Sequence, residues 1–497
     1  MKLLSAAQMK EWDKYTIHKE PISSIDLMEK ASKACFNWLE SNTAAKTFFV
    51  FCGYGNNGGD GLAIARLLSK LDVQVRAFIL DDGGTYSNDF NINLERLKSI
   101  FTVPITWLKP DAELPHIPEH AVIIDAIFGT GLNRPLDGLS EKLVNYINDL
   151  PNRIISIDMP SGLLCDSSSK NYTAIKADDT LTFQCLKKAF LIPENEENFG
   201  KVHILNIGLH PAYPDTIESQ FEMIDKALVQ SFYRPRKDFA HKGSFGHALI
   251  VAGSFGKMGA AILCTRACLR SGVGLVTAHV PEKGIDTIQT STPEAMCKID
   301  KSGDIVSEID YDLGLYSAIG IGPGIGKEQA TANLLHGLLQ YYKKPMVLDA
   351  DALNILAVNR DWYSLLPENT ILTPHPVEFT RLFDETMDDF EKTEIALQKA
   401  KELNAVILLK GHHTLVATPS GKGYFNTTGN AGMAKGGSGD ILTGILTGLL
   451  AQGYTSEQAT IMGVYLHGLA GDRAAEKYGM DAMISGDLVE EMKHAFI

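Results

Sequence analysis

The chain has 497 residues, 45% of them apolar, so about two to four globular domains with sizeable cores are expected. Its net charge of −14 and the lack of a Lys/Arg-rich run argue against nucleic acid as a partner. No apolar run reaches ~18 residues, which argues against a membrane span. Seven scattered cysteines without a CxxC pair indicate a reducing, cytoplasmic setting.

The first expected elements form a strand–loop–helix unit. A helix is predicted over residues 5–40, where Glu11, Asp13 and Glu20 interrupt the apolar stripe. A buried strand at 47–51 then runs into a glycine-rich loop at 52–61, which opens a helix at 62–70. This arrangement holds phosphates in doubly wound folds.

Two later strands, at 121–125 and 153–158, end in polar loops at the same sheet edge. Ligands collect at the carboxyl ends of strands in an open parallel sheet, so all three loops should line one pocket. The candidate binding residues there are Asn56, Asn57, Gly58, Gly59, Asp60, Gly129, Thr130, Gly131, Leu132, Asn133, Arg134, Pro135 and Asp158.

Two kinds of chemistry are candidates in this pocket. Asn57, Asp125 and Ser161 offer the oxygen ligands that suit a hard cation, although Asn57 and Ser161 would also serve as helix caps. Asp158 ends a buried strand shortly before a proline, where it either anchors the turn or moves protons on a substrate. The second role, as a base acting on a substrate, is favoured.

Prolines and a glycine at 206–215 mark a boundary, and one short strand is expected just beyond it at 221–224. The predicted organisation is a first domain at 1–215, a linker at 216–229 and a second domain at 230–497.

The second domain repeats the alternation of strands and helices. A strand at 248–252 leads through a glycine-rich turn into a helix near Ala260. Gly322 and Gly324 would allow a ligand to approach the backbone closely, and His375 lies between two prolines that fix its conformation. Lys410 follows the strand 405–409, where it would meet a phosphate as a point charge.

The stretch 430–440 is the most informative part of the chain. Its glycines, Gly439 among them, let backbone N–H groups converge on an anion, and an apolar helix begins at the same point. Asp440 would then take a proton from a substrate hydroxyl as phosphate arrives. The plain alternative is a glycine-rich turn capped by Asp440.

These motifs resemble two known families. The N-terminal half is similar to NAD(P)H-hydrate epimerases over about 1–215, and the C-terminal half resembles ADP/ATP-dependent NAD(P)H-hydrate dehydratases of the ribokinase-like fold over about 230–497. In this order they resemble the bifunctional nicotinamide-nucleotide repair enzymes of prokaryotes. The resemblance implies two α/β domains, Rossmann-like and then ribokinase-like.

The resemblance also implies ligands. In such epimerases the positions of Asn57, Asp125 and Ser161 bind K⁺. In the dehydratases Mg²⁺ accompanies the nucleotide, and Asp349, Asp351 and Asn354 are candidates to organise it through water. The implied nucleotide-binding residues are Lys410, Gly411, His412, His413, Thr414 and Gly439, and the implied contacts to the hydrated substrate are Ala260, Gly322, Gly324, His375 and Asp440.

The activity that the resemblance implies is repair of NADHX and NADPHX, by epimerisation of the R and S hydrates and ADP-dependent dehydration of the S form. Physics alone does not choose between ADP and ATP, or between the two substrates. A homo-oligomer is expected. The rival interpretations are a small-molecule kinase, which would leave a stable phosphorylated product, and an N-terminal half that serves as a binding or scaffold module.

Overall fold

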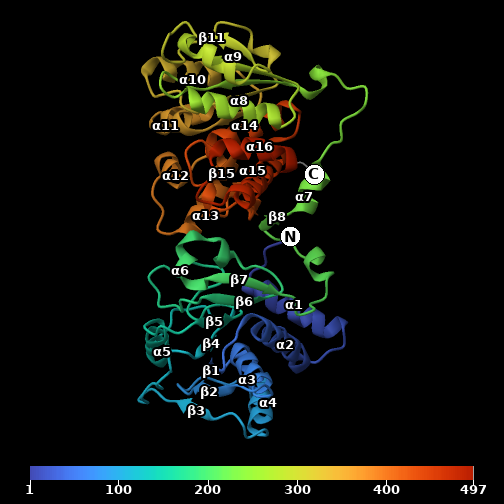
Figure 1. Ribbon diagram of the computed structural model, residues 1–497, viewed down its shortest axis with the longest axis vertical. Helices are drawn as coiled ribbons and strands as arrows, with labels where there is room; N and C mark the ends of the chain where they lie inside the picture. The colour runs from blue at the N-terminus through green and yellow to red at the C-terminus, as the bar shows by residue number, and fades with distance from the viewer. Residues whose placement is uncertain (496–497) are drawn as a thin grey trace. The chain divides into compact units, whose positions relative to one another are not determined.

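The computed structural model describes residues 1–495 and divides the chain into two compact units. The N-terminal unit comprises residues 2–219 with 388–390, and the C-terminal unit comprises residue 1, residues 220–387 and the chain from 391 onward. Figure 1 shows the elements in chain order from blue to red. No helix within residues 1–495 is long and apolar enough to cross a membrane.

The N-terminal unit contains a seven-stranded sheet in the order β3-β2-β1-β4-β5-β6-β7. Every neighbouring pair is parallel. The chain order reverses between β1 and β4, which is where a ligand crevice forms in doubly wound folds. The strands are β1 (Thr47–Cys52), β2 (Gln74–Leu80), β3 (Ile105–Leu108), β4 (Val122–Ala126), β5 (Ile154–Ile157), β6 (Asp179–Phe183) and β7 (Lys201–Leu205).

Helices cover both faces of this sheet (Figure 1). Successive side chains of a strand point to opposite faces, so Phe48 and Val50 pack with α2, α3 and α4, while Phe49 and Phe51 pack with α5. The helices of the unit are α1 (Ala6–Lys19), α2 (Ser24–Asn42), α3 (Asn56–Leu68), α4 (Asn88–Lys98), α5 (Gly138–Asn148) and α6 (Glu196–Phe199).

The single helix expected over residues 5–40 is wrong, because α1 and α2 are separate helices. Pro21 disfavours helical geometry at Glu20, where α1 ends. The Ser23 side chain then accepts a hydrogen bond from the Asp26 amide and caps α2. The break lets α1 fold back, so that Met9 packs near Leu27 of α2.

The C-terminal unit contains a ten-stranded sheet in the order β11-β10-β9-β12-β13-β14-β15-β16-β17-β8. Its strands from β9 to β15 are parallel, and β16 is antiparallel to both neighbours. The strands are β8 (Phe221–Ile224), β9 (His247–Val251), β10 (Leu275–Val280), β11 (Met296–Ile299), β12 (Ala318–Ile321), β13 (Met346–Leu348), β14 (Ile371–Leu372), β15 (Val406–Leu409), β16 (Leu415–Ala417) and β17 (Gly423–Asn426).

Residues 216–229, expected as a linker, contain β8 and the start of α7. The short strand expected at 221–224 is β8 itself, and it pairs parallel with β17 at the end of the sheet. The buried side chains of Ile224 and Val229 belong to the core of the C-terminal unit.

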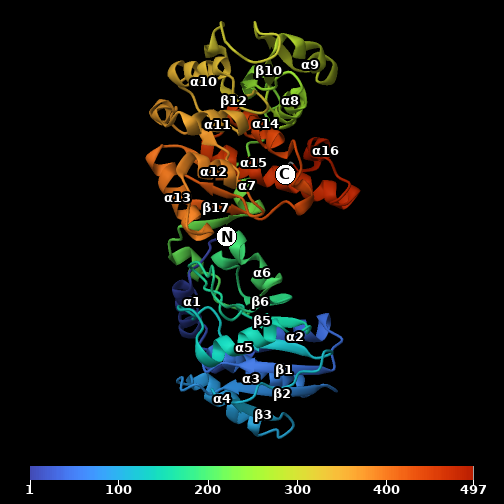
Figure 2. The same ribbon diagram turned by 90° about the vertical axis from the view of Figure 1, so that its left-hand side faces the viewer.

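Helices again cover both faces, and Figure 2 shows α10 to α12 on the side opposite α8 and α16. The core on one face joins Ala248 and Ile250 of β9 to α8, α14, α15 and α16. The helices of this unit are α7 (Lys226–Phe232), α8 (Met258–Arg270), α9 (Ile285–Ser291), α10 (Gln329–Tyr341), α11 (Ala350–Val358), α12 (Pro376–Phe383), α13 (Asp389–Glu402), α14 (Ser438–Ala451), α15 (Ser456–Tyr478) and α16 (Ser485–Ala495).

Two candidate active sites

A cavity of about 720 Å³ opens at the carboxyl ends of β1, β4 and β5 in the N-terminal unit. The expected binding residues that line it are Asn56, Asn57, Asp60, Gly129, Thr130, Gly131, Leu132, Asn133, Arg134 and Asp158. Gly58, Gly59, Pro135, Asp125 and Ser161 are not among its lining residues. The stretch 56–61, expected to be a loop, forms the first turns of α3, so the helix N-terminus itself faces the cavity.

Asp158 is held in this cavity by an ion pair that the sequence did not reveal. Its Oδ1 lies 3.1 Å from Nζ of Lys187, whose side chain is fully buried. Lys187 also donates to Oγ1 of Thr182 and to the carbonyl of Phe183, at 2.7 and 2.8 Å. The sequence after β6 shows only two adjacent lysines, Lys187 and Lys188, between apolar residues, which does not identify this role.

The backbone conformation of Asp158 brings three loops together. Asp158 has a φ of 65°, which is uncommon for a residue with a side chain. Its Oδ2 accepts a hydrogen bond of 3.1 Å from the Thr130 amide. A Cβ at Gly129 would lie 2.9 Å from this same oxygen and 3.3 Å from Cγ of Asn57, so only glycine fits there.

Asp125 and Ser161 lie together beneath the cavity. Asp125 is fully buried and accepts bonds from Oγ and N of Ser161, at 2.5 and 2.9 Å, and from Oγ of Ser156. Burial raises the pKa of Asp125, although these hydrogen bonds oppose the shift. Both polar atoms of the Asn57 side chain are buried without a partner among residues 1–495. A buried carboxyl group and an unsatisfied amide oxygen fit a hard monovalent cation.

Two more carboxyl groups face the same cavity. Asp60 is buried and accepts a 3.0 Å bond from Oγ of Ser32, and burial raises its pKa well above the ordinary value. Asp13 of α1 also lines this cavity. Burial, and then the charge of Asp158, raise the pKa of Asp13 to about 7. The sequence had marked Asp13 only as an interruption of an apolar stripe.

The second site forms around the N-terminus of α14. Gly437 precedes the helix with a φ of 97°, and α14 begins at Ser438. Asp472 fixes the preceding loop by accepting 3.0 Å bonds from the Gly429 amide and the Asn430 side chain. Lys435 donates to three backbone carbonyls, so an anion here would meet backbone amides rather than this lysine.

Asp349, at the end of β13, has its carboxylate fully engaged. It accepts bonds of 2.8 Å from Nζ of Lys410, Oγ1 of Thr373 and Oγ1 of Thr443. Burial alone would raise the pKa of Asp349, but the charge of Lys410 and these bonds lower it. Asp349 therefore positions Lys410 at the end of β15.

The three residues considered for Mg²⁺ do not fit direct ligation. Asp349 is satisfied by its three donors. Oδ2 of Asp351 accepts a 2.9 Å bond from the Gly326 amide, and Oδ1 of Asn354 accepts a 2.7 Å bond from Arg381. These side chains therefore have no role as direct metal ligands in the proposed reactions.

Asp440 lies in the first turn of α14 beside this ion pair. Its carboxylate has no hydrogen-bond partner within residues 1–495. Burial, and then the charge of Asp349, raise the pKa of Asp440 to about 6, while Lys410 opposes the shift. A Cβ at the adjacent Gly439 would lie 3.6 Å from Nζ of Lys410, so these groups surround one small space.

The other expected substrate contacts occupy neighbouring strand ends. Gly322 has a φ of 135°, and a Cβ there would lie 1.8 Å from the carbonyl oxygen of Asp349, so the backbone approach requires glycine. A Cβ at Gly324 would lie 3.2 Å from Cβ of Ala260. The Ala260 amide, expected to meet the substrate, donates instead to the Lys257 carbonyl at 3.2 Å. His375 caps α12 through Nδ1, and its ring is half exposed.

The expected nucleotide loop follows β15. Within it, Oγ1 of Thr414 donates a 3.0 Å bond to the Gly411 carbonyl and closes a tight turn. Burial and the neighbouring His412 lower the pKa of His413 to about 4, so this ring is neutral. No group of three or more His, Cys, Asp or Glu side chains in the described chain is arranged to hold a metal ion.

The sequence missed His467 of α15. Its Nε2 lies 3.0 Å from the Ser438 carbonyl, and its pKa is lowered to about 4 by burial. His467 therefore supports the start of α14.

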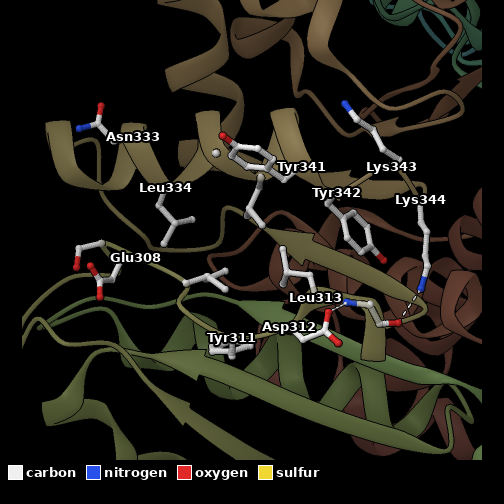
Figure 3. A pocket seen from close by; sticks show the side chains of 15 residues that line it. Glu308, Tyr311, Asp312, Leu313, Asn333, Leu334, Tyr341, Tyr342, Lys343 and Lys344 are labelled. Carbon is white, nitrogen blue, oxygen red and sulfur yellow. Dashed lines mark hydrogen bonds between the residues drawn. The ribbon is translucent and has the colours of Figure 1, made fainter.

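A separate cavity of about 680 Å³ lies in the C-terminal unit beside α10. Figure 3 shows Leu334, Tyr341 and Tyr342 around it, together with Glu308 and Asp312. None of the expected site residues lines this cavity. Its volume is comparable to that of the cavity in the N-terminal unit.

The folds and the two sites define a two-domain α/β enzyme with one candidate site in each domain. A family profile described as YjeF-related protein N-terminus matches residues 24–189, and one described as NAD(P)H-hydrate dehydratase matches residues 248–494. The chain is 35% identical to the bifunctional NAD(P)H-hydrate repair enzyme Nnr of Moorella thermoacetica, in a match that covers 99% of this chain and 96% of that enzyme. It is 32% identical to the enzyme of the same name from Thermofilum pendens, in a match that covers 100% of this chain and 96% of that enzyme.

A solved structure of the ADP/ATP-dependent NAD(P)H-hydrate dehydratase from Bacillus subtilis covers 55% of this chain and 97% of its own, at 30% identity and a TM-score of 0.49. By its full-length relatives, the chain belongs to the family of bifunctional NAD(P)H-hydrate repair enzymes. The expected α/β class, Rossmann-like and then ribokinase-like, is confirmed.

Proposed function

We propose that the chain restores hydrated NADH and NADPH, with an epimerase site in the N-terminal unit and a nucleotide-dependent dehydratase site in the C-terminal unit. The observation that carries the proposal is the carboxylate of Asp440. It lies at the N-terminus of α14 without a hydrogen-bond partner in residues 1–495, beside a lysine that Asp349 holds in place.

The dehydratase chemistry follows from that arrangement. Hydroxide is a poor leaving group, whereas phosphate leaves readily. Asp440 takes the proton of the substrate hydroxyl as the hydroxyl oxygen attacks the terminal phosphorus of ADP, and AMP departs. The amides of α14 and Nζ of Lys410 bear the phosphate charge. Phosphate then leaves with the electrons of the C–O bond as the ring nitrogen's lone pair forms a C=N⁺ bond, and loss of a proton from the adjacent carbon restores the dihydropyridine.

The epimerase chemistry centres on Asp158. Its carboxylate lines the cavity and is held by Lys187 and the Thr130 amide, so it is positioned to act as a base at the hydrated ring carbon. Asn57, Asp125 and Ser161 would hold K⁺ beside it. The ion would compensate the buried charge of Asp125 and help to fix the three loops.

The finer assignments rest on family membership. We propose ADP rather than ATP as the co-substrate, and both NADHX and NADPHX as substrates. Mg²⁺ would arrive with the nucleotide. A homo-oligomer in the cytoplasm remains the expected form of the protein.

The test is to incubate the protein with mixed R and S hydrates, with and without ADP, and to follow NADH by absorbance. Both hydrates should disappear with ADP, because epimerisation feeds the S form to the dehydratase. Without ADP only the ratio of R to S should change. A stable phosphorylated product would instead support the small-molecule kinase, and absence of R–S exchange would support the scaffold interpretation.

A further inference from the structure

The N-terminal cavity contains one carboxyl group for which the proposed epimerase reaction has so far no use. Asp13 projects from α1 into the cavity that Asp158 also lines. It makes no hydrogen bond within residues 1–495. The other acids of the cavity have partners, since Asp60 accepts from Ser32 and Asp166 accepts from the Ala6 amide.

We propose that Asp13 is the second catalytic residue of the epimerase site, acting as acid when Asp158 acts as base and as base when Asp158 acts as acid. The inference rests on the proposed epimerase function. It assigns the two carboxyl groups to different elements, α1 and the residue that follows β5, and both groups line the same cavity.

The step balances with water alone. Asp13 gives its proton to the substrate hydroxyl, the C–O bond breaks, and the ring nitrogen's electron pair forms a C=N⁺ bond as water leaves. A water molecule then adds to the other face of that carbon and gives its proton to the Asp158 carboxylate. The proton has passed from Asp13 to Asp158, and exchange with solvent or a turnover in the opposite direction restores the starting state.

The charges around the two acids fit this division. Lys187 pairs with Asp158 at 3.1 Å, whereas no cation makes an ion pair with Asp13 in the described chain. Burial, and then the charge of Asp158, raise the pKa of Asp13 to about 7 although Lys187 opposes the shift, so Asp13 can hold a proton near neutral pH. The other charged groups lining this cavity are Lys10, Asp60, Arg134 and Asp166.

The unsatisfied Asn57 side chain independently marks the space between the acids as a ligand site. Both of its polar atoms are buried without partners in residues 1–495, although Asn57 lines the same cavity. A bound hydrate would satisfy both atoms, whereas the proposed cation would satisfy Oδ1 alone.

The test compares the intact chain with its Asp13→Asn and Asp13→Glu variants, with Glu11→Gln as the matched control. Glu11 lies on the same helix, and its side chain is 57% exposed. R–S exchange is measured by chromatography without ADP between pH 5 and 9. Dehydration of the S hydrate with ADP, in the same samples, reports that the chain is folded and that the proposed function holds at its other site.

Asp13→Asn should slow R–S exchange by about a hundredfold or more and abolish its decline above about pH 7. Asp13→Glu should keep that decline with a smaller loss of rate, and Glu11→Gln should change neither. In isotopically labelled water, each epimerisation by the intact chain should introduce one solvent oxygen.

Exchange by Asp13→Asn near the parent rate, a slower rate with the alkaline decline intact, or retention of the original oxygen would each overturn the proposal. Failure of the intact chain to exchange R and S at all would refute the proposed epimerase function instead.

Discussion

The two sites use the same parts in opposite ways. Each has a lysine paired with an aspartate, the buried Lys187 with Asp158 and the partly exposed Lys410 with Asp349, and each has a further carboxyl group with no cation partner in residues 1–495. In the N-terminal site the paired aspartate faces the cavity. In the C-terminal site Asp349 is only 2% exposed and is saturated by two threonines, so the unpaired Asp440 is left to react. The comparison teaches that a lysine–aspartate pair marks a site but does not identify its working carboxylate.

Removal of the unpaired acid Asp440 from the C-terminal site should have the largest effect on one activity alone. Asp440→Asn keeps the shape of the side chain but cannot accept a proton. Dehydration of the S hydrate should fall by about 10²–10⁴-fold, which is the usual cost of losing a general base. R–S exchange should remain at the parent rate, because that site lies in the other unit. Asp440→Asn activity near the parent rate would show that Asp440 is not the base of the dehydration.

Removing a buried lysine should affect folding as well as catalysis. Lys187→Met leaves Asp158 without its cation, and loss of one partner of a buried pair costs about 3–5 kcal/mol. The matched control is Lys176→Met, since the Lys176–Glu197 pair is exposed and worth at most about 1 kcal/mol.

Tryptophan fluorescence in a urea titration should resolve the two variants, because Trp12, Trp38 and Trp107 lie in the N-terminal unit. Equal unfolding midpoints for Lys187→Met and Lys176→Met would contradict a structural role for the buried pair.

The pH dependence of the two activities should run in opposite directions. Dehydration needs ionised Asp440, whose pKa is raised to about 6, so its rate should fall about tenfold per unit at pH values well below 6. The epimerase pair instead loses its proton above about pH 7. Rates of both reactions between pH 5 and 9 on one preparation test this. Parallel profiles would mean that one shared process, such as unfolding, limits both.

Exchange of the monovalent cation should distinguish the sites by a smaller effect. If Asn57, Asp125 and Ser161 hold K⁺, replacement of K⁺ by Li⁺ should slow R–S exchange severalfold and leave dehydration unchanged. Asp125→Ala should abolish this dependence together with the epimerase activity. An epimerase indifferent to the ion would refute the cation site.

Separation of the units should have the smallest effect. Residues 1–219 and 220–497 should each keep one activity, because each unit contains its own sheet and core. A C-terminal piece that starts at residue 225 loses β8 and should be less stable to heat than one that starts at 220. Equal melting temperatures of these two pieces would show that β8 adds nothing to the sheet.

Local patterns predicted the parts of these sites that are built from contiguous residues. The strand ends, the turn before α14 and the loop 129–135 lie close to where the sequence placed them, because glycine and alternating apolar runs determine local geometry. Pro21 also predicts the end of α1, but the apolar pattern on both sides of it suggested one continuous helix.

Roles that depend on distant partners were not predictable. The sequence suggested that Asp349 organises Mg²⁺ through water, but it did not show that Thr373, Lys410 and Thr443, which lie far along the chain, donate to its carboxylate. Lys187 and Asp13 likewise acquire a role only when β6 and α1 meet at one cavity.

The pairing of β8 with β17 has a consequence for synthesis of the chain. Met223 pairs with Phe425, so about 200 residues separate the partners. At a translation rate of about 5–20 residues per second, β8 emerges roughly 10–40 s before its partner exists. During that interval the N-terminal unit has all of the contiguous residues of its own sheet, while the sheet of the C-terminal unit lacks an edge. Contacts this distant in sequence also slow folding, so we expect the last unit made to be the one that most needs protection by chaperones.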